Sequence, residues 1–212
     1  MMRPPPYILA FVVPLSACGA AGALSQATLA GQCAPDDAAC SQRRPQAPIA
    51  VGTRFYPDVT ADIAGNTAPA LRLESADPSV LAVEDGAVVA RAPGASALLI
   101  STDDGSIVDF VHVWVAPVTR MTLARRDGER IEAAVGLAVG EDLTVVPALW
   151  NGNQRLAGAA DVIWEIQGDG ALALLQDGTS DRRRLRARAP GKATITARLG
   201  DAHAAVAVEV VQ

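Results

Sequence analysis

The pentapeptide "ARAPG" occurs twice in the chain, at Ala90–Gly94 and again at Ala187–Gly191. The sequence before each copy also corresponds: "SVLAVEDG" occupies Ser79–Gly86 and "ALALLQDG" occupies Ala171–Gly178. Matched blocks that keep their order are typical of a tandem repeat, in which one structural unit occurs twice.

Further blocks extend the repeat on both sides of the pentapeptide. Upstream, the paired positions are Leu73 with Trp164, Val51-Gly52 with Val139-Gly140, and Gly65-Asn66 with Gly152-Asn153. Downstream, a gapless alignment pairs Leu98 with Ile195 and Val111 with Val208. The repeat therefore spans most of residues 48–212.

Short runs of alternating apolar and polar residues, such as "FVHVWV" at 110–115 and "VAVEVV" at 206–211, make up each copy. Such runs between turn signals predict β-strands. Beyond the apolar run near the N-terminus, no segment has the apolar periodicity of a helix. Pro-Gly in ARAPG predicts a turn between two strands of one hairpin, with glycine in the left-handed conformation. The sequence predicts an all-β chain of two tandem β-sandwiches.

The layout resembles the bacterial immunoglobulin-like domain of group 2, which is repeated in intimin- and invasin-type surface proteins. The resemblance is strongest for "DPSVLAVEDGAVVARAPGASAL", which begins at Asp77, and weaker in the second copy, which has five inserted residues. It implies two immunoglobulin-like Greek-key sandwiches, at 48–116 and 117–212, used as spacer or adhesive modules. Val118–Val135 has no counterpart before Pro48, so the opening strand of the first copy is either missing or supplied by the preceding segment.

Residues 1–17 predict a signal peptide, because Arg3 precedes an apolar run at Ile8–Leu15 that is shorter than the about 20 residues of a membrane span. The tetrapeptide "LSAC" at Leu15–Cys18 resembles the lipobox of bacterial lipoproteins. The resemblance implies that Cys18 carries lipid in the cell envelope, and Gly19 in place of aspartate implies transport to the outer membrane. The alternative is an ordinary signal peptide cut nearby.

Residues 18–47, rich in small and polar residues, predict a flexible tether behind the lipid anchor. If Cys18 is lipidated, Cys33 and Cys40 are the two remaining cysteines, and we expect a disulfide between them. A disulfide that closes this short loop would restrict the unfolded chain and so stabilise the fold by roughly 2.5 kcal/mol. A metal or haem site is the alternative, but no histidine lies nearby.

Composition argues against several classes of function. Eighteen basic against 23 acidic residues give a net charge of −5, which does not favour nucleic-acid binding. With His112 and His203 as the two histidines and no nucleophile or phosphate-loop motif, we predict no enzyme, cofactor or small-molecule substrate. The acidic pairs Asp36-Asp37 and Asp103-Asp104 are interpreted as solvated turns, so no metal site is predicted.

The run "DRRRLRAR", which begins at residue 181, is the sharpest candidate for binding. Strand alternation directs Leu185 and Ala187 inward and Arg184, Arg186 and Arg188 outward. Three guanidinium groups on one face could hold phosphate or carboxylate groups of an anionic glycan or acidic protein. Alternatively, the charges protect a strand edge from aggregation.

The three tryptophans divide between core and surface. Trp164 is predicted in the core, Trp114 on the exposed face of His112, and Trp150 near a loop tip.

These features predict a non-catalytic, lipid-anchored protein of the bacterial cell envelope. Its sandwiches would provide spacing or bind another envelope protein, with the membrane as a partner through the anchor. The alternative is a surface adhesin that binds glycan or host matrix.

Overall fold

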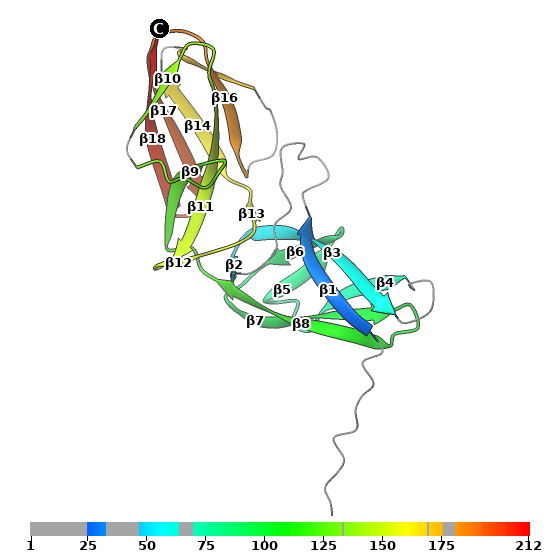
Figure 1. Cartoon of the computed structure of the whole chain (residues 1–212). Coiled ribbons are helices and arrows are strands. Elements are labelled where there is room, and N and C mark those ends of the chain that lie inside the picture. Colours follow the sequence, from blue (N-terminus) through cyan, green and yellow to red (C-terminus); the bar gives the residue numbers. More distant parts are fainter. Residues whose placement is uncertain (1–24, 33–46, 64–69, 133, 169, 176–180) are drawn as a thin grey trace, which may run out of the picture.

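The structure, a computed structural model, describes residues 25–32, 47–63, 70–132, 134–168, 170–175 and 181–212. Throughout these residues the regular secondary structure is β-strand (Figure 1). No helix in this part of the chain is long and apolar enough to cross a membrane. The signal peptide, Cys18, Cys33 and Cys40 lie outside the described residues, so their lipidation and pairing remain predictions.

The strands of the first half run from β1 to β8: β1 (Ser25–Gln32), β2 (Ile49–Ala50), β3 (Thr53–Ile63), β4 (Leu71–Ser75), β5 (Leu81–Glu84), β6 (Ala87–Ala90), β7 (Gly94–Thr102) and β8 (Ile107–Ala116). Those of the second half are β9 (Arg120–Arg125), β10 (Ala134–Ala138), β11 (Asp142–Asn151), β12 (Gln154–Arg155), β13 (Ala159–Ala160), β14 (Ile163–Gly168), β15 (Leu172–Leu174), β16 (Arg183–Ala187), β17 (Gly191–Leu199) and β18 (Ala202–Val211).

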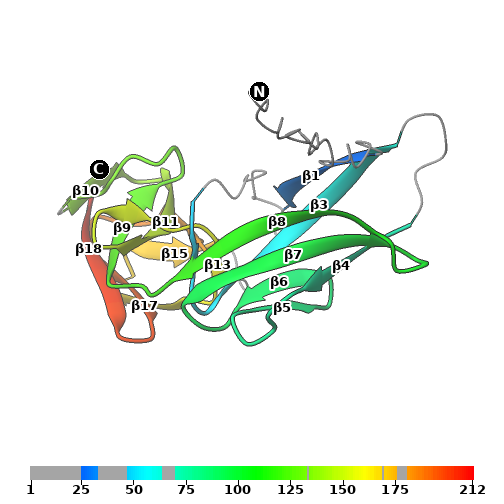
Figure 2. The same ribbon diagram turned by 90° about the horizontal axis from the view of Figure 1, so that it is seen from below.

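Each half contains two sheets with the same strand arrangement. In the first sandwich (β1–β8), sheet β1-β3-β6-β5 faces sheet β2-β8-β7-β4 (Figure 2). In the second sandwich (β9–β12 and β14–β18), sheet β12-β11-β16-β15, with β9 also on β11, faces sheet β10-β18-β17-β14. The predicted all-β, immunoglobulin-like sandwich fold is therefore confirmed.

An apolar core fills each sandwich because strand residues alternate between the two faces of a sheet. In β8, for example, Val113 and Val115 are buried while His112 and Trp114 are exposed. The buried residues of the first core are Ile49, Phe55, Leu81, Val88, Ala90, Leu98, Val113 and Val115. The second core includes Leu123, Leu137, Leu143, Val145, Leu185, Ile195, Val206 and Val208. Complete burial of one such side chain stabilises the fold by about 1.5–3 kcal/mol.

Backbone hydrogen bonds of the two halves repeat at equivalent positions. The amide of Gly52 donates to Ala90 O at 2.8 Å, and the amide of Gly140 donates to Ala187 O at 2.8 Å. Both glycines have positive φ, of 79° and 89°. The predicted correspondence of Val51-Gly52 with Val139-Gly140 is confirmed by these contacts.

The interpretation of ARAPG as a hairpin turn was wrong. In both halves the segment crosses from one sheet to the other, from β6 to β7 and from β16 to β17. Gly94 has φ of 153°, far from the left-handed helical value of about 57°. A Cβ at Gly94 would lie 3.1 Å from Val80 Cγ2, and one at Gly191 would lie 3.3 Å from Ala171 Cβ. The glycine therefore permits close approach of the crossing segment to the residue directly before β5 or β15.

The gapless alignment of the last strands was also wrong by two residues. Ser96 pairs with Val113, and its equivalent Ala193 pairs with Val208. Val113 thus corresponds to Val208, because the β7–β8 hairpin has a longer tip than the two-residue turn between β17 and β18.

The predicted flexible tether was wrong for residues 25–32. These residues form β1, which pairs antiparallel with β3 from Ser25↔Ile63 to Gln32↔Tyr56. In the second sandwich β9 pairs with β11 in the same way, so the opening strand of the first copy is supplied by the preceding segment. Its sequence "SQATLAGQ" has no alternating apolar pattern, but pairing along a strand uses backbone groups of any residue.

The segment that follows β12 joins the first sandwich. The two residues of β13, Ala159 and Ala160, pair antiparallel with Arg54 and Thr53 of β3. The amide of Ala50 donates to Ala157 O at 3.0 Å. Backbone pairing therefore connects the two sandwiches in addition to the covalent connection.

Side chains reinforce this junction. Ala50 of β2 is fully buried and belongs to the second core. Arg54 forms an ion pair with Asp161 at 2.8 Å between Nη2 and Oδ2. One strand of the first sandwich thus contributes to packing of the second.

Candidate anion-binding site

The predicted arginine strand, β16, is an inner strand of its sheet. It pairs with β11 on one side and with β15 on the other. The alternative that its charges protect a sheet edge is therefore wrong for β16. Leu185 and Ala187 are buried, and Arg184, Arg186 and Arg188 are exposed, as strand alternation predicted. Their binding role stays a prediction.

The guanidinium group of Arg186 forms an ion pair with a carboxylate of the neighbouring strand. Its Nε lies 2.6 Å from Asp142 Oδ1, and its Nη2 lies 3.0 Å from Oδ2. The hydrogen bond from Arg186 holds the pKa of Asp142 below its usual range, with a smaller contribution from the charge of Arg184. Arg186 therefore has a partner within the fold and is not a free guanidinium group.

Arg188 lies beyond β16, in the crossing segment, where its amide donates to Ala171 O at 2.8 Å. Of the three predicted arginines, this leaves Arg184 as the one that lies on β16 without a carboxylate partner among the described residues. The three side chains therefore do not form one continuous row of unpaired guanidinium groups.

A second arginine lies near Arg184 in space. Thr144 of β11 pairs with Arg184 on one side, and Val145 pairs with Arg125 of β9 on the other. The next residue after β9, Arg126, therefore stands beside Thr144. The order across the outer face is Arg126, Thr144, Arg184, which we call the arginine row.

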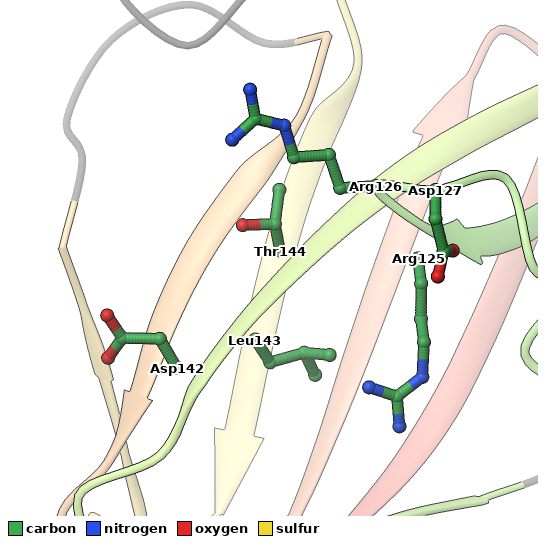
Figure 3. Close-up of a pocket in the computed structure, with 6 residues that line it drawn as sticks. All are labelled: Arg125, Arg126, Asp127, Asp142, Leu143 and Thr144. Carbon is green, nitrogen blue, oxygen red and sulfur yellow. The ribbon is translucent and has the colours of Figure 1, made fainter.

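A shallow groove of about 500 Å³ lies at one end of this row (Figure 3). Its lining residues are Arg125, Arg126, Asp127, Asp142, Leu143 and Thr144. The side chains of Arg125 and Arg126 point in opposite directions, and that of Arg126 lies on the same side as Thr144 (Figure 3).

Sequence reasoning missed Arg126. It lies in "ARRDGER", where Asp127-Gly128 indicates a turn, and nothing in that pattern places it on the same sheet face as Arg184. The relevant signal is long-range: β9 and β16 flank the same strand, β11.

The neighbouring arginines have structural roles. The side chain of Arg182 is 2% exposed and contacts Asp181 at 2.9 and 3.1 Å. Arg183 lies over the ring of Trp164, with 5.9 Å between Cζ and the ring centroid. Arg182 and Arg183 thus make contacts within the fold, whereas Arg184, Arg186 and Arg188 are exposed.

Exposed aromatic rings line the first sandwich. Phe110 and Trp114 of β8 are 54% and 60% exposed, and His112 lies between them. The centroid of His112 lies 5.3 Å from that of Phe110 and 6.3 Å from that of Trp114. Trp114 thus lies on the same face of β8 as His112, as strand alternation predicted, and it is exposed rather than partly buried.

The other two tryptophans are half-buried. Trp164 packs against the second core, which agrees with its predicted place. Trp150 donates from Nε1 to Thr122 Oγ1 at 3.0 Å, and Arg120 stacks on its ring at 4.7 Å.

In the described part of the chain, no three His, Cys, Asp or Glu side chains come together as metal ligands. Asp103 pairs with Arg72 at 2.8 Å, and Asp104 accepts from Thr102 Oγ1. Asp36 and Asp37 lie outside the described residues.

No protein-family model matches the chain, and no curated protein matches it. Among solved structures, domains 4 and 5 of the S-layer protein SbsC are similar, with 17% identity over 88% of this chain and 98% of that chain, at a TM-score of 0.32.

Two bacterial adhesins are also similar. The Escherichia coli adhesin FdeC has 13% identity over 89% of this chain and 64% of its own, at a TM-score of 0.33. The Yersinia pseudotuberculosis adhesin InvE has 11% identity over 88% of this chain and 59% of its own, at a TM-score of 0.34. This chain thus spans less than two thirds of either adhesin structure. Similarity at this level assigns no ligand or partner to it.

Proposed function

We propose that the chain is a non-catalytic, lipid-anchored protein of the bacterial cell envelope, which binds another envelope component through the outer face of β16 and β11. The observation that carries this proposal is the arginine row. Arg126 and Arg184 place two positive charges on one sheet face of a chain whose net charge is −5. Such a local excess of charge favours an anionic surface as the partner.

The anchor in this proposal is lipid on Cys18, as the resemblance of Leu15–Cys18 to a lipobox implies, and the membrane is the outer membrane. The binding unit is the second sandwich, with residues 48–116 and 117–212 as domains. β1 adds an opening strand from the preceding segment to the first domain.

A surface adhesin is the second candidate, and the aromatic row of Phe110, His112 and Trp114 favours it. Strand pairing makes Ala205, Ala207 and Glu209 of β18 the equivalents of these residues. The sandwich therefore forms without aromatic side chains at these positions, so packing does not account for the exposed rings. Rings on a flat sheet face are suited to contact with a sugar or a protein.

Cross-linking in intact cells tests the proposal. The chain and its Cys18→Ala variant are fractionated, cross-linked and purified, and co-purified proteins are identified by mass spectrometry. We expect membrane association that is lost with Cys18→Ala, and a stoichiometric envelope component that is lost with Arg126→Glu/Arg184→Glu.

Arg198→Glu is the control, because Arg198 is exposed on the other sheet of the same sandwich. An envelope component that is still captured by Arg126→Glu/Arg184→Glu contradicts the proposed face. Capture of glycan with loss on Trp114→Ala supports the adhesin instead.

A further inference from the structure

We propose that Arg126, Thr144 and Arg184 form a binding site for a phosphate group. This inference rests on the proposed function, because it names the ligand class of the same sheet face. The three residues lie on adjacent strands or directly after one, so their side chains start from neighbouring positions of one sheet face.

Spacing in the sheet favours convergence of the two arginines. Residues that face each other on adjacent antiparallel strands have Cβ atoms about 4.5–5.5 Å apart. On this sheet face Thr144, which has a hydroxyl group, lies between Arg126 and Arg184. Long guanidinium side chains on either side of this short residue can approach one ligand from two directions, with the hydroxyl beneath it.

The balance of charge leaves these two arginines available. Within the described residues, neither Arg126 nor Arg184 forms an ion pair with an acidic side chain. The acidic groups near them have other partners: Asp142 is bound to Arg186, and Asp181 is bound to Arg182.

Two further charged groups, Asp127 and Arg125, line the groove. Asp127 Oδ1 accepts from the amide of Glu129 at 3.0 Å, which directs this carboxylate to its own turn. Arg125 lies 3.8 Å from Glu129 and points away from Arg126 (Figure 3). Because Arg125 and Arg186 are paired with carboxylates, Arg126 and Arg184 together outweigh the one negative charge of Asp127, and the arginine row remains locally cationic.

Geometry favours phosphate over carboxylate. A planar carboxylate is satisfied by one guanidinium fork, as Asp142 and Arg186 demonstrate in the next row of the same sheet. Two guanidinium groups and a hydroxyl supply more donors than two coplanar oxygens can accept with good geometry. A terminal phosphate has three oxygens in a tetrahedral arrangement and a charge near −2, and it can accept from all three side chains.

The first sandwich provides an internal comparison. Strand pairing makes Tyr56 and Ala87 the equivalents of Thr144 and Arg184, and Gln32 the equivalent of Arg126. Neither arginine is therefore required to form a sandwich of this arrangement. Their presence in one half alone indicates a role that the other half lacks.

Titration of the full chain with inorganic phosphate tests the site. The Cys18→Ala variant is used so that no lipid is attached, and chloride keeps the ionic strength constant. We expect saturable NMR shifts of the side-chain Nε–H signals of Arg126 and Arg184. Arg126→Gln and Arg184→Gln should each raise Kd about tenfold, as expected for loss of a charge-assisted hydrogen bond. Thr144→Val should have a smaller effect.

Arg198→Gln is the matched control, because it removes the same charge from the opposite sheet, and it should leave Kd unchanged. Circular dichroism of each variant verifies that it folds. An absence of saturable shifts, an equal effect of Arg198→Gln, or acetate binding as tight as phosphate binding would each overturn the proposal.

Vesicles distinguish the sources of the phosphate group. Cosedimentation with phosphatidic acid but not with phosphatidylcholine assigns the group to a lipid, and binding of free phosphate without vesicle binding assigns it to a soluble or glycan-borne ligand. If phosphate fails to bind while the cross-linked envelope component is still captured through Arg126 and Arg184, the phosphate site is overturned and the proposed function stands.

Discussion

Replacement of Gly158 by alanine is expected to disrupt the junction between the two sandwiches. Gly158 directly precedes β13 and has φ of 104°, a conformation that residues with a Cβ rarely adopt. A Cβ at this position would lie 2.0 Å from Thr53 Oγ1 and 2.7 Å from Thr53 Cβ. Neither atom is the far end of a flexible side chain, so β3 or β13 must move.

The expected loss in the free energy of unfolding follows from the backbone conformation of Gly158 and from the contacts of Thr53. The backbone conformation alone costs about 1–2 kcal/mol for a residue with a Cβ. Thr53 is buried, and its hydroxyl donates to Ala50 O at 2.7 Å. Displacement of Thr53 breaks this buried hydrogen bond, which costs about 1–3 kcal/mol. Gly158→Ala should therefore lower the free energy of unfolding by about 2–5 kcal/mol in total.

Urea unfolding of the full chain, followed by tryptophan fluorescence, measures this change. Trp114 reports on the first sandwich, and Trp150 and Trp164 report on the second. We expect the transitions of the two sandwiches to separate in Gly158→Ala, because the strand pairing that connects them is weakened.

Gly152→Ala is the matched control. Gly152 also has positive φ, of 56°, but a Cβ there would meet no atom within 4 Å. It therefore has the backbone cost without the collision. If Gly158→Ala destabilises the chain no more than Gly152→Ala does, the close packing of Gly158 on Thr53 is refuted.

Two further predictions concern acid stability and the opening strand. The pKa of Asp142 is lowered in the folded state by Arg186, so its stabilisation is present above the unfolded-state pKa and is lost as pH falls through the folded-state pKa. In urea titrations, the free energy of unfolding should fall as the pH is lowered below about 4. Asp142→Asn should reduce this fall, whereas Asp201→Asn, on an exposed turn, should leave it unchanged. Amides of residues 25–32 that are hydrogen-bonded to β3 should exchange slowly with solvent. Uniformly fast exchange of these amides would indicate a flexible tether instead of a strand.

The repeat could be predicted from sequence because each half keeps turn glycines and apolar side chains at equivalent structural positions. Leu73 and Trp164 illustrate this: each occupies the same place on its strand, opposite Ile100 and Ala197. Alternation along β16 likewise followed from the sequence, since burial on one face of a strand has a period of two.

The errors concern contacts between distant segments. Pro-Gly specifies that the chain turns, but local sequence does not specify whether the strands on either side pair with each other or belong to opposite sheets. The pairing of Arg186 with Asp142 joins residues 44 positions apart. No short motif encodes it, and the same holds for the position of Arg126 beside β11, on the sheet face that also carries Arg184.

Parallel strand pairs close both sandwiches, and this arrangement determines how each responds to mechanical tension. β2 runs parallel to β8, and β10 runs parallel to β18. A force that pulls the ends of a sandwich apart along these strands loads their hydrogen bonds together, in shear, so several must break at once. The pairing of β10 spans five residues, from Ala134 to Ala138, whereas β2 pairs through Ile49 and Ala50 alone. Under tension applied across both sandwiches, the first would therefore yield before the second.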